Sequence, residues 1–205
     1  MSKKISQLDK KELSQEEVGS DSSTALFGFW IYIMSDCLLF ASIFAAYAVL
    51  HNSTFGGPTG RDLFDMPFVL TETLILLTST FTYGLVTLYA HKKEHKTHVV
   101  LWMLTTIILG IIFLVMEVSE FRNLIVKGYG PDESAFLSSF FTLVGTHGLH
   151  VFVGLIWMVS LCIQALKSDL NERIVKKLSM LGLFWHFLDI IWIFIFTIVY
   201  LMAFI

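Results

Sequence analysis

The sequence predicts an all-α integral membrane protein in which five transmembrane helices form one bundle. Hydrophobic residues make up 55% of the 205 residues and charged residues only 15%, whereas about a quarter of the residues in a soluble domain are charged. Phe alone occurs 19 times. The net charge of -3 argues against nucleic-acid binding, which requires a basic surface.

Five long apolar runs follow one another along the chain. A transmembrane helix needs about 20 apolar residues, and each run is close to that length or longer. Because the runs are continuously apolar and do not alternate with polar residues, they favour helices over the strands of a barrel. The predicted spans are 25–50, 67–90, 99–116, 136–166 and 178–205.

Residues 1–24 differ from the rest because they are polar and of mixed charge. They contain no apolar run and no small-residue cleavage site, so they do not resemble a signal peptide. We expect residues 1–24 to be a mobile cytoplasmic tail and residues 25–205 to form the five-helix membrane domain.

The basic residues predict the orientation, because Lys and Arg are enriched in cytoplasmic segments. With the N-terminus inside, the inner segments hold 11 of the 14 basic residues (four in the tail, three in 91–98 and four in 167–177). The outer segments hold the other three, Arg61, Arg122 and Lys127. The sequence therefore predicts a cytoplasmic N-terminus and a periplasmic C-terminus.

Two acids inside predicted spans are candidates for function. Asp36 lies near the middle of the first span and Glu72 lies about one turn into the second. A carboxylate in the hydrocarbon layer is costly, so each should face the bundle, take up a proton or meet a partner. A functional role competes here with a purely structural one, in which the protonated acid bonds to a neighbouring helix.

Three further pairs of polar residues share a helix face at i, i+3 spacing. They are Glu117 and Glu120, His147 and His150, and His186 and Asp189. Di-metal carboxylate bundles use Glu-x-x-His pairs, and no such pair occurs here. The pairs therefore favour an interhelical polar network over a metal site, and we assign no catalytic residue and no metal ligand.

Two other classes of protein remain open from these residues. A membrane metalloprotein or b-type cytochrome would use His147, His150 and His186 as ligands. A transporter would place Asp36 and Glu72 on its transport pathway. Transporters often bind their substrates at interrupted helices, and no proline interrupts the predicted spans, which argues against this class.

Motifs in all five spans give the sequence a recognisable family resemblance. The chain resembles subunit III of the haem-copper oxidases in five stretches, which occur in the order found in that family. These stretches are Gly28-Phe-Trp-Ile-Tyr-Ile-Met-Ser-Asp-Cys, Glu72-Thr-Leu-Ile-Leu-Leu-Thr-Ser, Met116-Glu-Val-Ser-Glu-Phe, Gly145-Thr-His-Gly-Leu-His-Val and Phe184-Trp-His-Phe-Leu-Asp-Ile-Ile-Trp. The resemblance covers about residues 25–205 and is to the five-helix form, most similar to subunit 3 of the cytochrome bo-type ubiquinol oxidases.

The resemblance implies an accessory subunit of a proton-pumping terminal ubiquinol oxidase in a bacterial inner membrane. In such a complex the haems and copper belong to the catalytic subunit, so this chain would carry no cofactor. The implied partners are oxidase subunits I, II and IV, membrane phospholipids, and ubiquinol through the complex. The alternative within the family is subunit III of a cytochrome c oxidase.

The resemblance also bears on the candidate residues. Asp36 matches the position of a buried carboxylate in the family that is often Glu, and Glu117 stands where Gln is frequent. Glu120 matches the usual Glu. With Glu72, the residues Asp36 and Glu120 are expected to be lipid-cleft or proton-related carboxylates. The family uses none of the matching residues His147, His150, His186 and Asp189 as a metal ligand.

Overall fold

A computed structural model describes residues 2–92, 96–168 and 170–204, with the side chains of these residues except 2–23, 25 and 62. The described part of the chain is helical and contains no strand. It divides into two compact units, Met1–Leu39 and Phe40–Ile205, which are described separately. Helix α1 (Ser2–Leu50) begins in the first unit and ends in the second.

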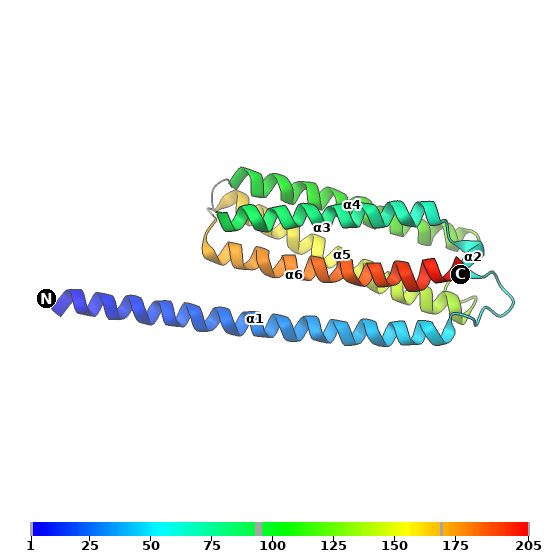
Figure 1. Ribbon diagram of the computed structural model, residues 1–205, viewed down its shortest axis with the longest axis horizontal. Helices are drawn as coiled ribbons and strands as arrows, with labels where there is room; N and C mark the ends of the chain where they lie inside the picture. The colour runs from blue at the N-terminus through cyan, green and yellow to red at the C-terminus, as the bar shows by residue number, and fades with distance from the viewer. Residues whose placement is uncertain (1, 93–95, 169, 205) are drawn as a thin grey trace. The chain divides into compact units, whose positions relative to one another are not determined.

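Four long helices form the body of the second unit (Figure 1). In this unit α3 packs against α4 and α6, and α5 packs against α4 and α6, so the four helices close into a ring. The short helix α2 contacts η2. The elements are α2 (Gly60–Leu63), α3 (Met66–Lys92), α4 (Lys96–Val126), α5 (Ala135–Lys167), α6 (Glu172–Ile195), the π-helical η1 (Phe196–Leu201) and the 3₁₀-helical η2 (Met202–Phe204).

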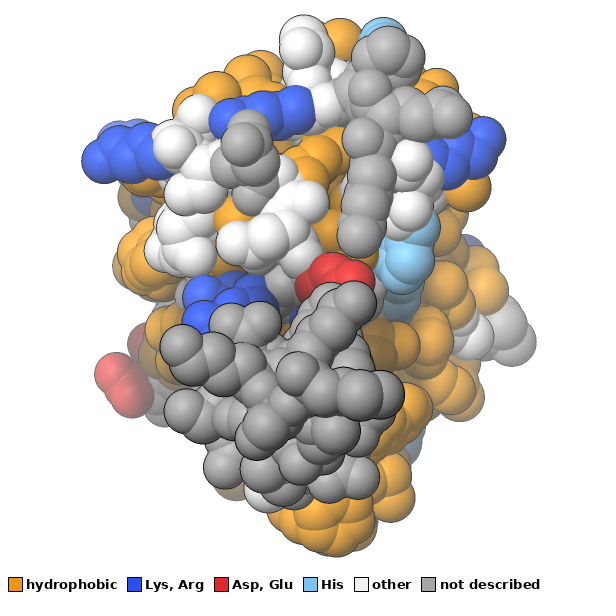
Figure 2. Space-filling model, turned by 90° about the vertical axis from the view of Figure 1, so that its left-hand side faces the viewer, with side chains coloured by type: hydrophobic (Ala, Val, Ile, Leu, Met, Phe, Trp, Pro, Cys, Tyr) orange, Lys and Arg blue, Asp and Glu red, His pale blue; other side chains and the backbone are white. Residues whose placement is uncertain are grey.

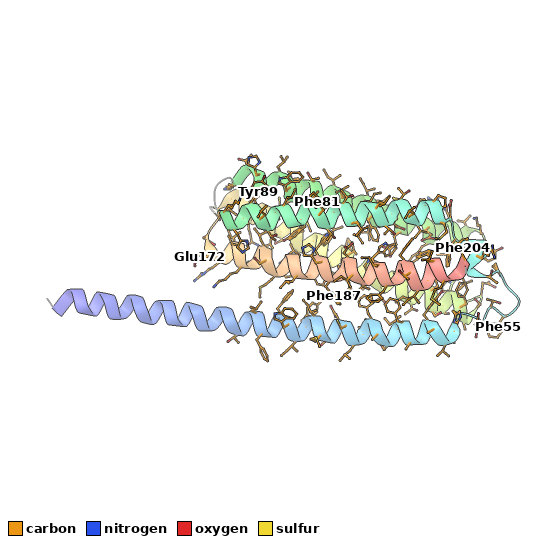
Figure 3. All side chains as sticks on the ribbon, viewed as in Figure 1. Phe55, Phe81, Tyr89, Glu172, Phe187 and Phe204 are labelled. Atoms are coloured by element: carbon orange, nitrogen blue, oxygen red, sulfur yellow. The ribbon has the colours of Figure 1, made fainter. Side chains whose placement is uncertain are left out.

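The prediction of five membrane-spanning helices is confirmed. The described residues contain five helical segments long and apolar enough to cross a bilayer, Leu26–Leu50, Met66–Lys92, Lys96–Val126, Ala135–Lys167 and Glu172–Phe204. The 27 residues of α3 rise about 40 Å, more than the roughly 30 Å of a hydrocarbon layer. Apolar side chains such as Phe81, which is 67% exposed, project from the bundle (Figure 3) as lipid-facing residues do.

The third span extends ten residues beyond the predicted end at Met116, to Val126. Gly128, with a φ of +85°, ends the helix in the left-handed conformation that glycine adopts at little cost. The Gly128 amide donates to the Ile125 carbonyl over 3.0 Å and the Tyr129 amide to the Leu124 carbonyl over 3.0 Å, the paired bonds of a glycine-terminated helix. Glu117 and Glu120, which come just after the predicted end of the span, therefore lie inside the helix.

The helical boundaries of the first and last spans also lie outside the apolar runs. Helix α6 begins at Glu172, where the Asn171 side chain accepts a 3.0 Å hydrogen bond from the Ile174 amide. Helix α1 continues through residues 2–24, the segment that we expect to be a mobile cytoplasmic tail. A charged residue ends the apolar run without ending the helix, because helix ends are set by capping. The domain boundary at residue 24 stays a prediction.

The core of the bundle is built around Trp185 of α6, which is 1% exposed. A Cβ atom placed on Gly110 would lie 3.1 Å from Cη2 of Trp185, and one placed on Gly154 would lie 3.2 Å from Cζ3. The indole therefore fills the space left by the two glycines of α4 and α5. Its Nε1 donates a 3.0 Å hydrogen bond to Oγ of Ser79 on α3, so one side chain joins all four helices of the ring.

Candidate functional site: a buried acidic cluster

Three of the predicted acids meet inside the bundle. Glu72 of α3 is 0% exposed, Glu117 of α4 is 2% exposed and Glu120 is 8% exposed. Glu72 lies close enough to both α4 carboxyl groups to interact with them electrostatically. We call Glu72, Glu117 and Glu120 the acidic cluster.

Tyr200 of η1 completes this cluster, and the sequence analysis did not identify it. Its side chain is 0% exposed, and its hydroxyl donates a 2.8 Å hydrogen bond to Oε2 of Glu120. The change from α to π winding at Phe196 alters the direction of each following side chain, and such segments are frequent at functional sites. Helical periodicity therefore could not have indicated which face Tyr200 occupies.

Two of the three acids, Glu72 and Glu117, have no polar partner among the described residues. Both carboxyl oxygens of Glu72 and both of Glu117 are buried without a hydrogen bond to any described group. Neither acid forms an ion pair with a described Lys, Arg or His side chain. The Glu117 carboxyl lies over Gly148 of α5, where a Cβ atom would meet its Cδ at 2.8 Å. Glycine at position 148 thus makes room for a carboxyl group.

His147, next to that glycine, lies among aromatic rings. It is 0% exposed, its ring centre is 5.2 Å from that of Trp192 and 6.0 Å from that of Phe113, and neither ring nitrogen has a hydrogen-bond partner in the described part of the chain. Trp192 in turn donates a 3.0 Å hydrogen bond to Oγ1 of Thr73, the neighbour of Glu72. The imidazole therefore belongs to the same interior layer as the acids.

Of the other predicted residues, His150 is close enough to His147 to interact with it electrostatically, whereas His186 and Asp189 lie beside Tyr83 and Thr80 of α3. His150 is half-buried, and its Nδ1 is 2.7 Å from the Thr146 carbonyl. His186 is half-buried with its ring 6.5 Å from that of Tyr83. Asp189 is 6% exposed, and its Oδ1 has no hydrogen-bond partner among the described residues. Their role as interhelical ties stays a prediction.

Asp36 belongs to the first unit, on α1, and is described within that unit alone. Tyr32, one helical turn earlier, is a hydrogen-bond partner of Asp36. Its expected role as a lipid-cleft carboxylate stays a prediction.

The predicted histidine and acid pairs do not converge as metal ligands do. In the described residues, no three His, Cys, Asp or Glu side chains are grouped so that they could hold a metal ion. Aromatic rings, those of Trp192, Phe113 and Phe40, lie beside His147. The cluster can hold or pass protons, because carboxyl, imidazole and phenol groups all accept or donate them.

Comparison with known proteins places these features in a family. Residues 19–204 match the family model described as cytochrome c oxidase subunit III. The chain is 52% identical over 203 residues to the cytochrome bo(3) ubiquinol oxidase subunit 3 of Pseudomonas aeruginosa, with 96% of this chain and 97% of the relative covered. It is 49% identical to the protein of that name from Pseudomonas putida, over 87% of this chain and 86% of the relative.

A relative named as a cytochrome c oxidase subunit is less similar in sequence. The cytochrome c oxidase subunit 3 of Bacillus sp. (strain PS3) is 42% identical, over 89% of this chain and 88% of its own length. The matches extend over nearly the whole chain and include all five spans. This five-span membrane protein therefore belongs to the cytochrome c oxidase subunit III family.

Proposed function

We propose that this chain is an accessory, cofactor-free subunit of a proton-pumping ubiquinol oxidase of the aerobic respiratory chain. The observation that carries the proposal is the 52% identity, across 96% of the chain, to a protein named as subunit 3 of a cytochrome bo(3) ubiquinol oxidase. The partner subunits I, II and IV would hold the haems and copper, oxidise quinol and reduce dioxygen to water. The chain itself would support assembly and sustained turnover.

The experiment is purification of the tagged full-length chain from its own bacterial membrane in mild detergent. We expect haem-containing subunits to accompany it and the complex to oxidise ubiquinol with consumption of dioxygen. Reduced cytochrome c, assayed in parallel, should not be oxidised. A chain that purifies without a haem-containing partner would contradict the proposal. Oxidation of cytochrome c would favour the cytochrome c oxidase alternative, which the similarity to the Bacillus relative supports.

We propose the bacterial inner membrane as the location, with the N-terminus in the cytoplasm and the C-terminus in the periplasm. The supporting observation is the uneven distribution of basic residues. Figure 2 views the end of the bundle at which α3 ends and α4 begins, and Lys and Arg side chains lie around it. They include Lys92, Lys96, Lys167, Arg173, Lys176 and Lys177. Reporter domains fused to either terminus should be active on opposite sides of the membrane.

We propose that the second unit also binds phospholipid. A groove of about 370 Å³ runs between the end of α1, at Ser42 and Ala46, and the start of α5, at Ser138 and Thr142. Its walls are mostly small side chains, which leave space for an acyl chain. Mass spectrometry of the purified complex should detect lipid, and Ala46→Phe, which fills the groove, should reduce the amount retained.

Asp36 tests the proposed support of turnover. If Asp36 organises lipid or protons beside the catalytic subunit, Asp36→Ala should leave the initial oxidase rate near that of wild type and hasten its decay over many turnovers, or lower assembly. The measurement is oxygen consumption over time at equal haem concentration. Equal yield together with an equal time course would show that Asp36 has no such role.

A further inference from the structure

The acidic cluster is energetically unusual for a structural feature. Glu72, Glu117 and His147 together present six buried nitrogen and oxygen atoms without a partner in the described structure. A buried polar atom without a partner is destabilising, and the net stability of a folded domain is small. Proteins break the rule of polar satisfaction chiefly at functional sites. Glu72, Glu117 and His147 are therefore candidates for a function.

Burial restricts what could occupy this site. Glu72 and His147 are 0% exposed within this chain alone, so no side chain of another subunit reaches them from outside. The described residues hold no grouping suited to a metal ion. The proton is the one cation that a carboxyl group can bind in a tightly packed interior without further ligands.

The groups are arranged from one end of the bundle inward. We name this end, where α2 and η2 meet, the α2 end. Glu120 lies six residues and Glu117 nine residues before the end of α4 at Val126, or about 9 and 14 Å along the helix. His147 lies twelve residues after the start of α5 at Ala135, or about 18 Å. Glu72 lies six residues after the start of α3 at Met66, or about 9 Å, so Glu72 and Glu120 share the outer level and Glu117 and His147 lie deeper.

The outer end of this series lies close to an exposed acid. Asp65, just before α3, is exposed and close enough to Glu120 to interact with it electrostatically. A cavity of about 350 Å³ at the same end is lined by Ile198 and Met202, two residues before and two after Tyr200, and by the polar side chains of His51 and Thr59. Glu120 itself keeps 8% of its surface exposed. Protons can therefore arrive at Glu120 from the aqueous phase.

We propose that Asp65, Glu120, Glu117, Glu72 and His147 form a proton-exchange ladder that connects the α2 end with the centre of the bundle. A proton from water binds a Glu120 carboxylate oxygen as a new O–H bond. That bond breaks when the proton passes to a carboxylate oxygen of Glu117 or Glu72, and Glu120 returns to the carboxylate form until water protonates it again. His147 is the innermost acceptor. Tyr200 holds Glu120 in place through its 2.8 Å hydrogen bond.

Two further titratable groups interact with this series. Tyr200 of η1 donates a hydrogen bond to Glu120, and half-buried His150 of α5 is close enough to His147 to interact with it electrostatically. The described side chains that pack against Glu72 and Glu117 supply no Lys or Arg counter-charge. The ladder therefore works by protons moving among neutral and anionic acids.

Infrared spectroscopy of the purified full-length chain, with the subunits that accompany it, tests the ladder without reference to oxidase activity. The C=O band of a protonated carboxyl group shifts when D₂O replaces H₂O, and Glu117→Gln should remove one such band. In Glu120→Gln the exchange of that band should slow by about 100-fold, the low end of the effect of a positioned proton-transfer group. Asp65→Asn should slow it less, because water can replace an exposed group.

A matched control lies at the opposite end of the bundle. Glu172 is exposed at the start of α6, is labelled in Figure 3, and Glu172→Gln should leave the exchange rate unchanged. The ladder is overturned if Glu117→Gln removes no band, if Glu120→Gln exchanges at the wild-type rate, or if Glu172→Gln slows exchange equally. If the Glu120→Gln variant fails to assemble, a wild-type exchange rate in the Asp65→Asn variant overturns the ladder.

Discussion

Replacing Gly110 with alanine tests whether the close packing around Trp185 determines the stability of the bundle. A Cβ atom on Gly110 would lie 2.8 Å from Cδ2 of Leu155 and 3.1 Å from Cη2 of Trp185. Carbon atoms pack at about 3.5–4.0 Å, so both neighbours would have to move by at least about 0.4–0.7 Å. Leu155 can rotate, whereas the hydrogen bond from Trp185 to Ser79 holds the indole.

The expected loss follows from two opposing effects. Overpacking a close-packed core costs about 1–3 kcal/mol, while replacing glycine inside a helix gains about 0.5–1 kcal/mol. The difference between these two effects is about 0–2.5 kcal/mol, and we expect Gly110→Ala to lower the free energy of unfolding by about 1 kcal/mol. Measured in a Trp185→Phe background, which removes atoms of the larger ring, the cost of Gly110→Ala should be smaller.

Gly84 provides the matched control, since it lies within transmembrane helix α3 and a Cβ atom there would have no neighbour within 4 Å. Gly84→Ala should be neutral or slightly stabilising. The assay is titration of the purified protein in mixed micelles with a denaturing detergent, followed by the fluorescence of the tryptophans. If Gly110→Ala unfolds at the same detergent fraction as Gly84→Ala, the reasoning from close packing is refuted.

Three further substitutions test single contacts by the same titration. Trp192→Phe leaves Oγ1 of Thr73 without its 3.0 Å donor and should cost about 1 kcal/mol, within the range of hydrogen bonds between membrane helices; a Thr73→Val background should abolish that cost. Asn171→Ala removes the cap of α6 and should cost about 1 kcal/mol, whereas Asn171→Ser should cost little. Gly128→Ala forces alanine to a φ of +85° and should cost about 1 kcal/mol or more, while Gly130→Ala, at a glycine without positive φ, should be tolerated.

The sequence predicted most residues of the site, but it did not predict that they lie together. Glu72, Glu117, Glu120 and His147 stood out because a titratable residue inside an apolar run is costly. Their meeting could not be derived, since no local pattern states which helices are neighbours. Tyr200 was missed because a buried tyrosine is ordinary in such a helix and because the π segment changes its direction.

The sequence by itself determined the class of the protein, the number of its spans and the approximate position of each. These properties follow from the hydrocarbon layer, which demands a fixed length of apolar helix whatever lies beside it. The tertiary structure decided which polar groups share the interior. The closure of α3, α4, α5 and α6 into a ring brings Glu72 to Glu117 and Glu120, and Gly148 makes room for a carboxyl group. Such contacts depend on helix rotation and close packing, which the period of an almost wholly apolar segment does not specify.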